Sequence, residues 1–312
     1  MGLALPLSQS LKAYVLPEKI IAVHPTSLSL AIGTRFSGLS NQTVYVYNLT
    51  DGRVLKKINS GPVGCLAFSP TGDLLAYIDS KGQGHIVDVK VGNSLLLAHK
   101  VSSGALTSLT FLDHHAIATG GMDGKVRIWD PRNGKLIDAW GGNSPISRIA
   151  VDPKDRYIGV SSFDGRVSIF SIGQHKLAFQ HQAPDMVLSL RYAARRFVWA
   201  TATQVEFFDL DTKKLSRVQV PPPRFIRPYR AMDCSPDGKL LAIDGGANIV
   251  YLFDVKTGLK ITEIQLPKSE SIGSIVFTYD SMMLVVGLVE SQTQLYRKVG
   301  QVWRILPVML PQ

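Results

Sequence analysis

This chain has little cysteine, no long apolar run and almost no helical periodicity. Its two cysteines, Cys65 and Cys234, fall short of a zinc site or a disulfide framework. We expect both to be buried, reduced thiols, as in a cytosolic or nuclear protein. No apolar run reaches the ~20 residues of a membrane helix, and the first residues lack the basic segment of a secretory signal. An intracellular location, cytoplasmic or nuclear, without membrane contact is therefore expected.

Signals for catalysis and for cofactors are also missing. The seven histidines are scattered, and the one adjacent pair, His114-His115, has no cysteine or acidic partner at metal-ligand spacing. No phosphate-binding loop of the GxxxxGK[ST] type and no dinucleotide fingerprint occurs. We expect no catalytic residue, no metal, no cofactor and no small-molecule substrate, and hence a protein that is not an enzyme.

What the chain does contain is a repeat, most clearly in DGKVRIWD from Asp123 to Asp130. Each copy ends on a hydrophobic residue followed by a polar one, and successive steps are 40, 42, 41, 38, 45 and 43 residues apart. They fall at Tyr47-Asn48, Val87-Asp88, Trp129-Asp130, Phe170-Ser171, Phe208-Asp209, Phe253-Asp254 and Tyr296-Arg297. A period near 40–45 residues is typical of a four-stranded propeller blade. Seven steps predict an all-β, seven-bladed β-propeller.

Turn signals separate short strands within each repeat. Ser-Pro-Thr-Gly-Asp at 69–73 and Ser-Pro-Asp-Gly-Lys at 235–239 combine a proline that fixes φ with a glycine that accepts positive φ. Asp-Gly pairs at 123–124 and 164–165 are hairpin signals. After the first pair, Val126 and Ile128 alternate with Arg127, which places the apolar side chains on one face of the strand and the polar side chain on the other.

Over residues 18–298 these repeats resemble those of the WD-repeat β-propeller family. Trp129-Asp130 is the one literal Trp-Asp step, and the Gly-His pair that often opens a family repeat is absent. The resemblance implies that the family's buried network of His, Asp, Ser or Thr, and Trp is incomplete here. It also implies structural roles for Asp123, Trp129, Asp130 and Asp164.

One segment resembles a particular branch of that family. Residues 185–199, with the loop and turn that follow, are similar to the late blades of the ribosome-bound receptor for activated C kinase. That similarity would place Phe253 in the final blade, whereas the repeat pattern puts one more step after it.

Either end of the chain can supply the outer strand of the seventh blade. The other outer strands are expected near Val54, Ser94, Lys135, Lys176, Leu215 and Leu259. The two candidates for the last one are Leu11–Leu16 and Val302–Val308. Pro307 and Pro311 disfavour a long strand at the C-terminus, so we expect N-terminal closure and a free tail that seeks a partner. The predicted division is an N-terminal segment at 1–17, a propeller at 18–298 and an apolar, basic tail at 299–312.

Positive charge is concentrated in one stretch. The net charge is +10, and residues 191–230 hold nine basic and three acidic residues. Within it, residues 221–230 read PPPRFIRPYR, an exposed loop in which arginines alternate with Phe225 and Tyr229. Guanidinium groups beside aromatic rings suit single-stranded RNA, and basic surface equally suits acidic proteins. The candidate contact residues are Arg191, Arg195, Arg196, Arg217, Arg224, Phe225, Arg227, Tyr229, Arg230, Trp303 and Arg304.

Three functions are compatible with this pattern. The first is a non-catalytic scaffold for protein–protein interactions in a multisubunit assembly, including a ribonucleoprotein. The second is a ribosome-associated or ribosome-assembly propeller that contacts RNA through the basic loop between blades five and six. The third is an enzyme with a site in the central channel, which would require converging carboxylates or histidines there.

Overall fold

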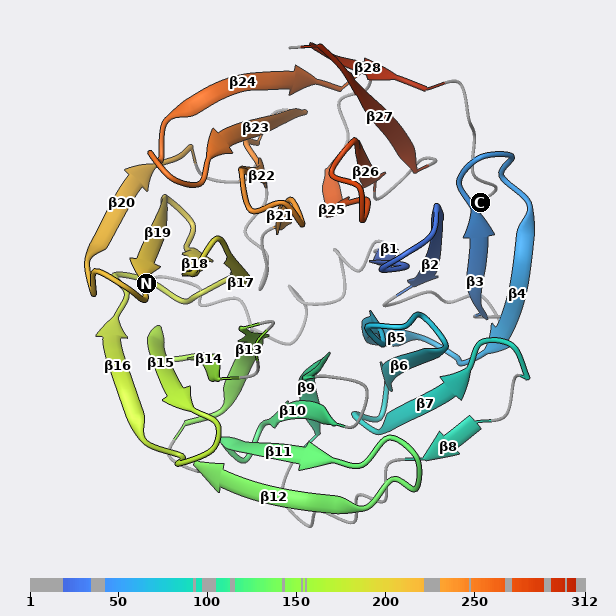
Figure 1. The fold of residues 1–312 in the computed structure, drawn as a ribbon, viewed down its shortest axis with the longest axis vertical. Helices are drawn as coiled ribbons and strands as arrows, with labels where there is room; N and C mark the ends of the chain where they lie inside the picture. The colour runs from blue at the N-terminus through green and yellow to red at the C-terminus, as the bar shows by residue number, and fades with distance from the viewer. Residues whose placement is uncertain are drawn as a thin grey trace, which may run out of the picture.

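The computed structural model describes residues 19–34, 43–91, 94–96, 105–112, 116–141, 144–152, 154, 156–221, 231–246, 248–266, 271–288, 293–300 and 302–306. Every regular element in these residues is a β-strand. The strands form seven antiparallel, four-stranded sheets arranged as a ring (Figure 1). The predicted seven-bladed, all-β propeller is confirmed.

Each blade consists of four strands that are consecutive in sequence. Blade one contains β1 (Lys19–Val23), β2 (Ser29–Thr34), β3 (Thr43–Asn48) and β4 (Val54–Asn59), and blade two contains β5 (Val63–Phe68), β6 (Leu74–Asp79), β7 (Gly84–Asp88) and β8 (Ser94–Leu96). Blade three contains β9 (Leu106–Phe111), β10 (Ile117–Gly121), β11 (Lys125–Trp129) and β12 (Leu136–Gly141), and blade four contains β13 (Ile146–Val151), β14 (Tyr157–Ser162), β15 (Arg166–Ser171) and β16 (Leu177–Gln182).

The remaining blades repeat this plan. Blade five contains β17 (Ser189–Ala193), β18 (Arg196–Ala200), β19 (Gln204–Asp209) and β20 (Leu215–Gln219), and blade six contains β21 (Met232–Cys234), β22 (Leu240–Asp244), β23 (Ile249–Asp254) and β24 (Lys260–Gln265). Blade seven contains β25 (Ile272–Phe277), β26 (Met283–Leu288), β27 (Gln294–Val299) and β28 (Val302–Ile305). The first strand of each blade lies next to the axis and the fourth lies at the rim (Figure 1).

The repeat seen in the sequence marks the third strand of every blade. All seven hydrophobic-polar steps fall at or next to the C-terminal part of β3, β7, β11, β15, β19, β23 and β27. The six outer strands predicted within the chain are likewise found, as β4, β8, β12, β16, β20 and β24. Regular turns therefore made the blade boundaries readable from sequence.

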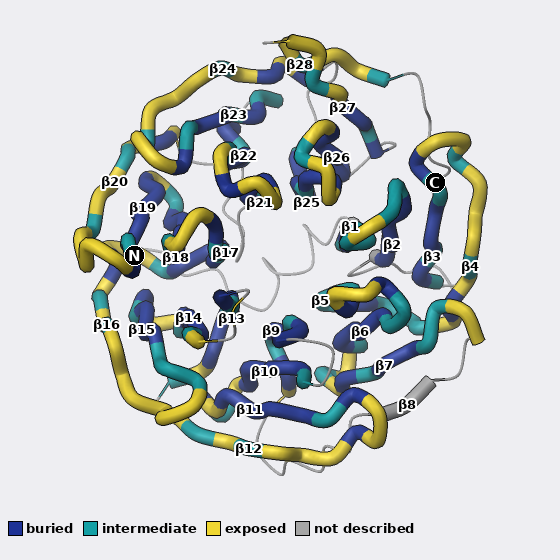
Figure 2. The backbone as a smooth tube through the Cα atoms, in the orientation of Figure 1, coloured by how far each residue is buried: buried dark blue, intermediate teal, exposed yellow. Residues whose placement is uncertain are grey.

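The blades stack face to face, so both faces of their inner strands are covered. Buried residues fill the inner strands, whereas exposed residues follow the outer strands and the turns (Figure 2). Arg127 lies on the face of its strand that was predicted to be polar, yet it is buried, because the neighbouring blade covers that face too. Close packing shows at Gly159 in blade four, where an added Cβ would lie 2.6 Å from the Phe197 ring of blade five.

The C-terminal segment supplies the outer strand of blade seven. β28 pairs with β27 in antiparallel register, with Arg297 opposite Arg304. The preference for an N-terminal closing strand was therefore wrong, and the sheet extends to Ile305, into the predicted tail. The prolines do not prevent this, because β28 is a short rim strand that ends before Pro307. The predicted N-terminal segment at 1–17 lies outside the described residues.

The junction between blades one and seven differs from the other six because no connecting loop crosses it. β1 and β25 are neighbours across the junction (Figure 1). Buried side chains from both blades form one cluster, which includes Ile21 and Leu30 of blade one and Val285 and Leu295 of blade seven. Among the described residues, side-chain packing therefore holds this junction, and no strand of one blade belongs to the sheet of the other.

The two cysteines lie in the first strands of blades two and six and are both free thiols. Cys234 is buried as expected, whereas Cys65 is half-buried and borders the central channel, where its Sγ donates to the Leu109 carbonyl at 3.7 Å. Burial raises the pKa of the Cys234 thiol well above its usual range. The protonated thiol is a poor nucleophile.

We expect Cys234 to resist alkylation in the native protein and to react only after unfolding. Mass spectrometry after treatment with iodoacetamide, with and without urea, measures this directly. The Cys65→Ser variant isolates the Cys234 signal, and the Cys234→Ser variant gives the matching signal for Cys65. Rapid native labelling of Cys234 would contradict the buried position of this side chain.

Candidate functional site

The residues assigned structural roles form a partial version of the expected network in blade three. Trp129 is 1% exposed, and its Nε1 donates to Thr119 Oγ1 at 2.7 Å. Asp123 pairs with Arg127, whose Nη2 donates to Asp123 Oδ2 at 2.5 Å. These hydrogen bonds from Arg127 lower the pKa of Asp123. In this blade, which has no Gly-His pair, Arg127 is thus the hydrogen-bond partner of the turn residue Asp123.

Asp130 and Asp164 both organise turns. Asp130 Oδ1 accepts from the backbone N–H and from Nε of Arg132, at 2.9 and 3.0 Å, and this contact lowers the pKa of Asp130 to about 2. Asp164 Oδ2 accepts from Ser144 Oγ at 2.7 Å, and its Oδ1 accepts from the backbone N–H of Arg166 at 3.1 Å. Side-chain acceptors of this kind fix a turn locally.

Two arginines of the predicted basic surface are paired with aspartates of blade five. Arg195 forms a bidentate ion pair with Asp211. Arg196 pairs with Asp209 at 3.0 Å and also donates to the carbonyls of Val255 and Lys256, at 2.5 and 2.7 Å. Because those carbonyls belong to the neighbouring blade six, Arg196 ties blades five and six together.

Arg191 takes part in a chain of contacts through three inner strands. Its Nε donates to Asp233 Oδ1 at 3.1 Å, and Asp233 Oδ2 accepts from the backbone N–H of Phe277 at 2.9 Å. Burial raises the pKa of Asp233, against the opposing effect of Arg191. Blades five, six and seven are thus linked at their inner strands. A single acidic residue inside the apolar run Ala231–Cys234 was the sequence signal for this contact.

The basic stretch does not form one continuous patch. Exposed Lys213 and Lys214 lie in the β19–β20 turn, on the same face of the ring as Arg195 in the β17–β18 turn. β20 then runs back to the opposite face and ends before Pro221, where the basic loop begins. Arg217 is exposed on β20 and has no ion-pair partner among the described residues. Arg224, Phe225, Arg227, Tyr229 and Arg230 lie outside the described residues.

The two tail candidates have different surroundings. Trp303 packs on the core of blades six and seven, with its ring centroid 6.0 Å from that of Phe277 in an edge-on arrangement. Arg304, the next residue of β28, is exposed. The alternation of a strand explains the difference, and it corrects the expectation that Trp303 belongs to a free tail.

A second buried polar network joins blades four and five. Glu206 is 1% exposed, and its Oε2 accepts from Trp199 Nε1 at 2.7 Å. Nε2 of His181, from the outer strand of blade four, lies 3.3 Å from the same oxygen. We missed this network in the sequence, where the available signal was a lone glutamate within the apolar strand QVEFFD.

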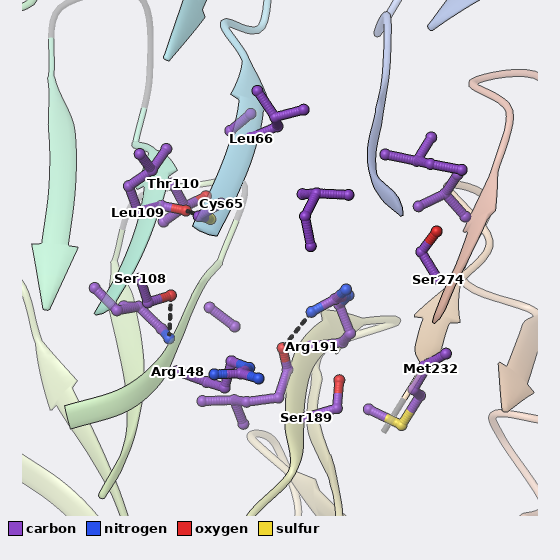
Figure 3. Close-up of a pocket in the computed structure, with 18 of the residues that line it drawn as sticks. Cys65, Leu66, Ser108, Leu109, Thr110, Arg148, Ser189, Arg191, Met232 and Ser274 are labelled. Carbon is purple, nitrogen blue, oxygen red and sulfur yellow. Dashed lines mark hydrogen bonds between the residues drawn. The ribbon is translucent and has the colours of Figure 1, made fainter. Parts of the chain in front are cut away.

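The central channel holds a cavity of about 370 Å³ bordered by the first strands of all seven blades. Its lining combines aliphatic residues and hydroxyls with Arg148 and Arg191 (Figure 3). Among the described residues that line it, none is a histidine or a carboxylate. Nor do three or more His, Cys, Asp or Glu side chains gather at metal-binding distance anywhere in the described part of the chain. The lining offers positive charge and hydroxyl donors instead.

Comparison with known proteins matches one repeat of this propeller to a family model. The model named WD domain, G-beta repeat matches residues 93–130, which run through β8 to β11 and end on Trp129-Asp130. In this stretch the seven-bladed propeller is similar to WD-repeat proteins. The matched repeat begins with the outer strand of blade two and finishes in blade three, so the repeat is offset from the sheet by one strand.

Several curated proteins are similar to this chain at low identity. WD repeat-containing protein 55 from Mus musculus is 28% identical over 177 residues, covering 54% of this chain and 45% of that protein. Periodic tryptophan protein 2 homolog from Schizosaccharomyces pombe is 25% identical over 217 residues, covering 68% of this chain and 22% of that protein. Telomerase protein component 1 from Rattus norvegicus is 29% identical over 115 residues, covering 36% of this chain and 4% of that protein. The chain thus spans less than half the length of these relatives.

The similarity to the receptor for activated C kinase is not supported. It would place Phe253 in the final blade, but Phe253 lies in β23 of blade six and a complete blade, β25 to β28, follows it. The relatives reported above, to which this chain is similar, are other proteins. No helix in the described residues is both long and apolar enough to span a membrane.

Proposed function

We propose that this WD-repeat propeller is a non-catalytic scaffold that binds other proteins of a multisubunit assembly inside the cell. Propellers of this family are typically protein-interaction platforms and usually non-catalytic. A rigid ring displays turns on two faces, so that several partners can bind at once. One relative is named as a telomerase component, which agrees with a place in a larger assembly.

The observation that carries this proposal is the exposed basic sector of blade five. Arg195 and Arg196 are each paired with an aspartate, whereas Arg217 on β20 is exposed and precedes in sequence the segment that contains Arg224, Arg227 and Arg230. We therefore propose that loop and rim as the main docking surface. An acidic protein surface is the complementary partner.

Direct RNA contact is the second candidate, favoured by the net charge of +10 and by the aromatic residues within the basic loop. A ribosome-associated or ribosome-assembly propeller would bind in this way. Neutralised phosphates release counterions, so RNA binding would weaken steeply as salt concentration rises.

Replacing Arg224, Arg227 and Arg230 together by Glu is expected to remove the bound partners from protein purified in mild salt from its native cells. Mass spectrometry and RNA sequencing, with and without nuclease, identify what is lost. The matched control replaces Lys81, Lys135 and Lys176 by Glu, because these exposed residues of blades two to four undergo the same charge change.

Each outcome separates the candidates. Proteins that resist nuclease and are lost only from the arginine variant support a scaffold that docks through the loop. Nuclease-sensitive partners or bound RNA, lost from the same variant, establish the RNA candidate. A protein set that both variants retain excludes the loop as the docking surface, and the absence of any specific partner contradicts the scaffold.

A further inference from the structure

The central channel is polar and basic on one side. The cavity of about 370 Å³ falls within the size range of small-molecule sites, which join apolar walls to a few convergent polar groups. Arg148 from β13 and Arg191 from β17 reach it from two neighbouring blades, with Ser189 beside them, and Ser274 from β25 lies across from Arg191 (Figure 3). Apolar side chains such as Leu66, Leu109 and Met232 complete the wall.

Both guanidinium groups are anchored to the ring by their own strands. Arg148 Nη1 donates to the Ser147 carbonyl at 2.7 Å, and Arg191 Nη1 donates to the Leu190 carbonyl at 3.0 Å. Arg191 is further fixed by Asp233. A guanidinium has five N–H donors in a planar fork, so it can be held by backbone carbonyls and also donate to the oxygens of an anion.

The opposite side of the cavity contributes a buried hydroxyl. The Oγ atom of Ser274 is buried and has no hydrogen-bond partner among the described residues, an arrangement that is costly for a buried polar atom. Other hydroxyls of the lining are already bonded: Ser108 Oγ accepts from the Ile149 N–H at 3.1 Å, and Thr107 Oγ1 donates to the Ile146 carbonyl at 2.6 Å. Ser274 thus lines the cavity with a hydroxyl whose hydrogen-bonding capacity is not satisfied by the described residues.

We propose that the central channel binds a small phosphorylated molecule, whose phosphoryl oxygens are held by Arg148 and Arg191 and reached by the Ser274 hydroxyl. Arginine forks match the geometry of phosphate oxygens, and none of the described residues that line the cavity is a carboxylate. The apolar wall then contacts the rest of the molecule. The inference does not rest on the proposed scaffold function.

Titration calorimetry of the full chain with inorganic pyrophosphate tests the site, at constant ionic strength with sodium chloride as the compensating salt. We expect saturable binding with one site per chain, and a rise in melting temperature with pyrophosphate that the same ionic strength of chloride does not produce. Arg148→Gln should raise the Kd at least tenfold, and Ser274→Ala should raise it severalfold without lowering the stability of the unliganded protein.

The matched control is Arg217→Gln, which removes the same charge from an exposed rim strand and should leave the Kd unchanged. Ser274→Ala keeps the test valid if Arg148→Gln fails to fold, because the Ser274 hydroxyl bonds to no group in the described part of the chain. Absence of saturable binding to the wild type overturns the proposal. So does a Kd that Arg148→Gln and Ser274→Ala leave unaltered, or one that Arg217→Gln raises as much as Arg148→Gln does.

Discussion

Asp123→Ala is expected to lower the free energy of unfolding by about 3–5 kcal/mol, because it leaves the Arg127 guanidinium buried without a counter-ion. The two side chains are only 9% and 7% exposed, and Asp123 Oδ1 and Oδ2 both accept from Arg127, at 3.0 and 2.5 Å. Equilibrium unfolding in urea, followed by tryptophan fluorescence, measures the change. Asp51→Ala is the matched control, because Asp51 pairs with Arg53 in an exposed turn, and it should unfold like the wild type.

The same pair predicts a dependence on pH. The pKa of Asp123 is lower in the folded protein than its unfolded value of about 3.9, so the ionised carboxylate stabilises the fold at neutral pH. This contribution is fully present above the unfolded pKa and is lost as the pH falls through the folded pKa. Between pH 5 and 3 the wild type should therefore lose stability relative to Asp123→Ala. A constant difference between the two proteins over this range would contradict the assigned role of Asp123.

Leu30→Ala should cost about 2–5 kcal/mol and, in addition, loosen the ring at one place. Leu30 is fully buried in the cluster that joins blade one to blade seven, across the junction without a connecting loop. Loss of the Leu30 side chain weakens the packing that joins the two blades in the described part of the chain. We therefore expect faster hydrogen exchange in β1 and β25, measured by mass spectrometry, than in strands of blades three and four.

Leu75→Ala is the matched control for this effect. Leu75 is equally buried, but its cluster joins blades one and two, whose junction is also spanned by the chain. It should lose a comparable free energy of unfolding without the local increase of exchange in β25. Equal exchange patterns in the two variants would show that the blade one to blade seven junction is no weaker than the others.

The fold was predictable because the signals for it are local. Turn residues such as Gly72 and Gly238 and a repeating third strand such as 125–129 fix each blade within about 45 residues. Ring closure was not predictable in this way, because both ends of the chain carry a short apolar segment. The closing strand is the segment that pairs with the edge of β27, which is β28. The sequence pattern does not show which of the two terminal segments makes this pairing.

The surface chemistry was less predictable than the fold. Counting charges placed Arg191, Arg195 and Arg196 on a binding surface, but their partners are 42, 16 and 13 residues away on other strands. A linear charge count cannot register such pairs, which depend on the inward or outward direction of each side chain. The lining of the central channel could not be predicted for a similar reason. Arg148 and Ser274 are far apart in sequence and reach the same cavity only because the ring closes.

Closure of the ring by packing alone has a consequence during synthesis of the chain. The blade-one face formed by Ile21, Leu30 and Ile32 is complete early, yet its partners on blade seven are about 250 residues further along. At ~5–20 residues per second, a ribosome needs about 12–50 s to supply them. An apolar face thus stays uncovered on the nascent chain for most of translation, which makes it a natural binding site for a cotranslational chaperone.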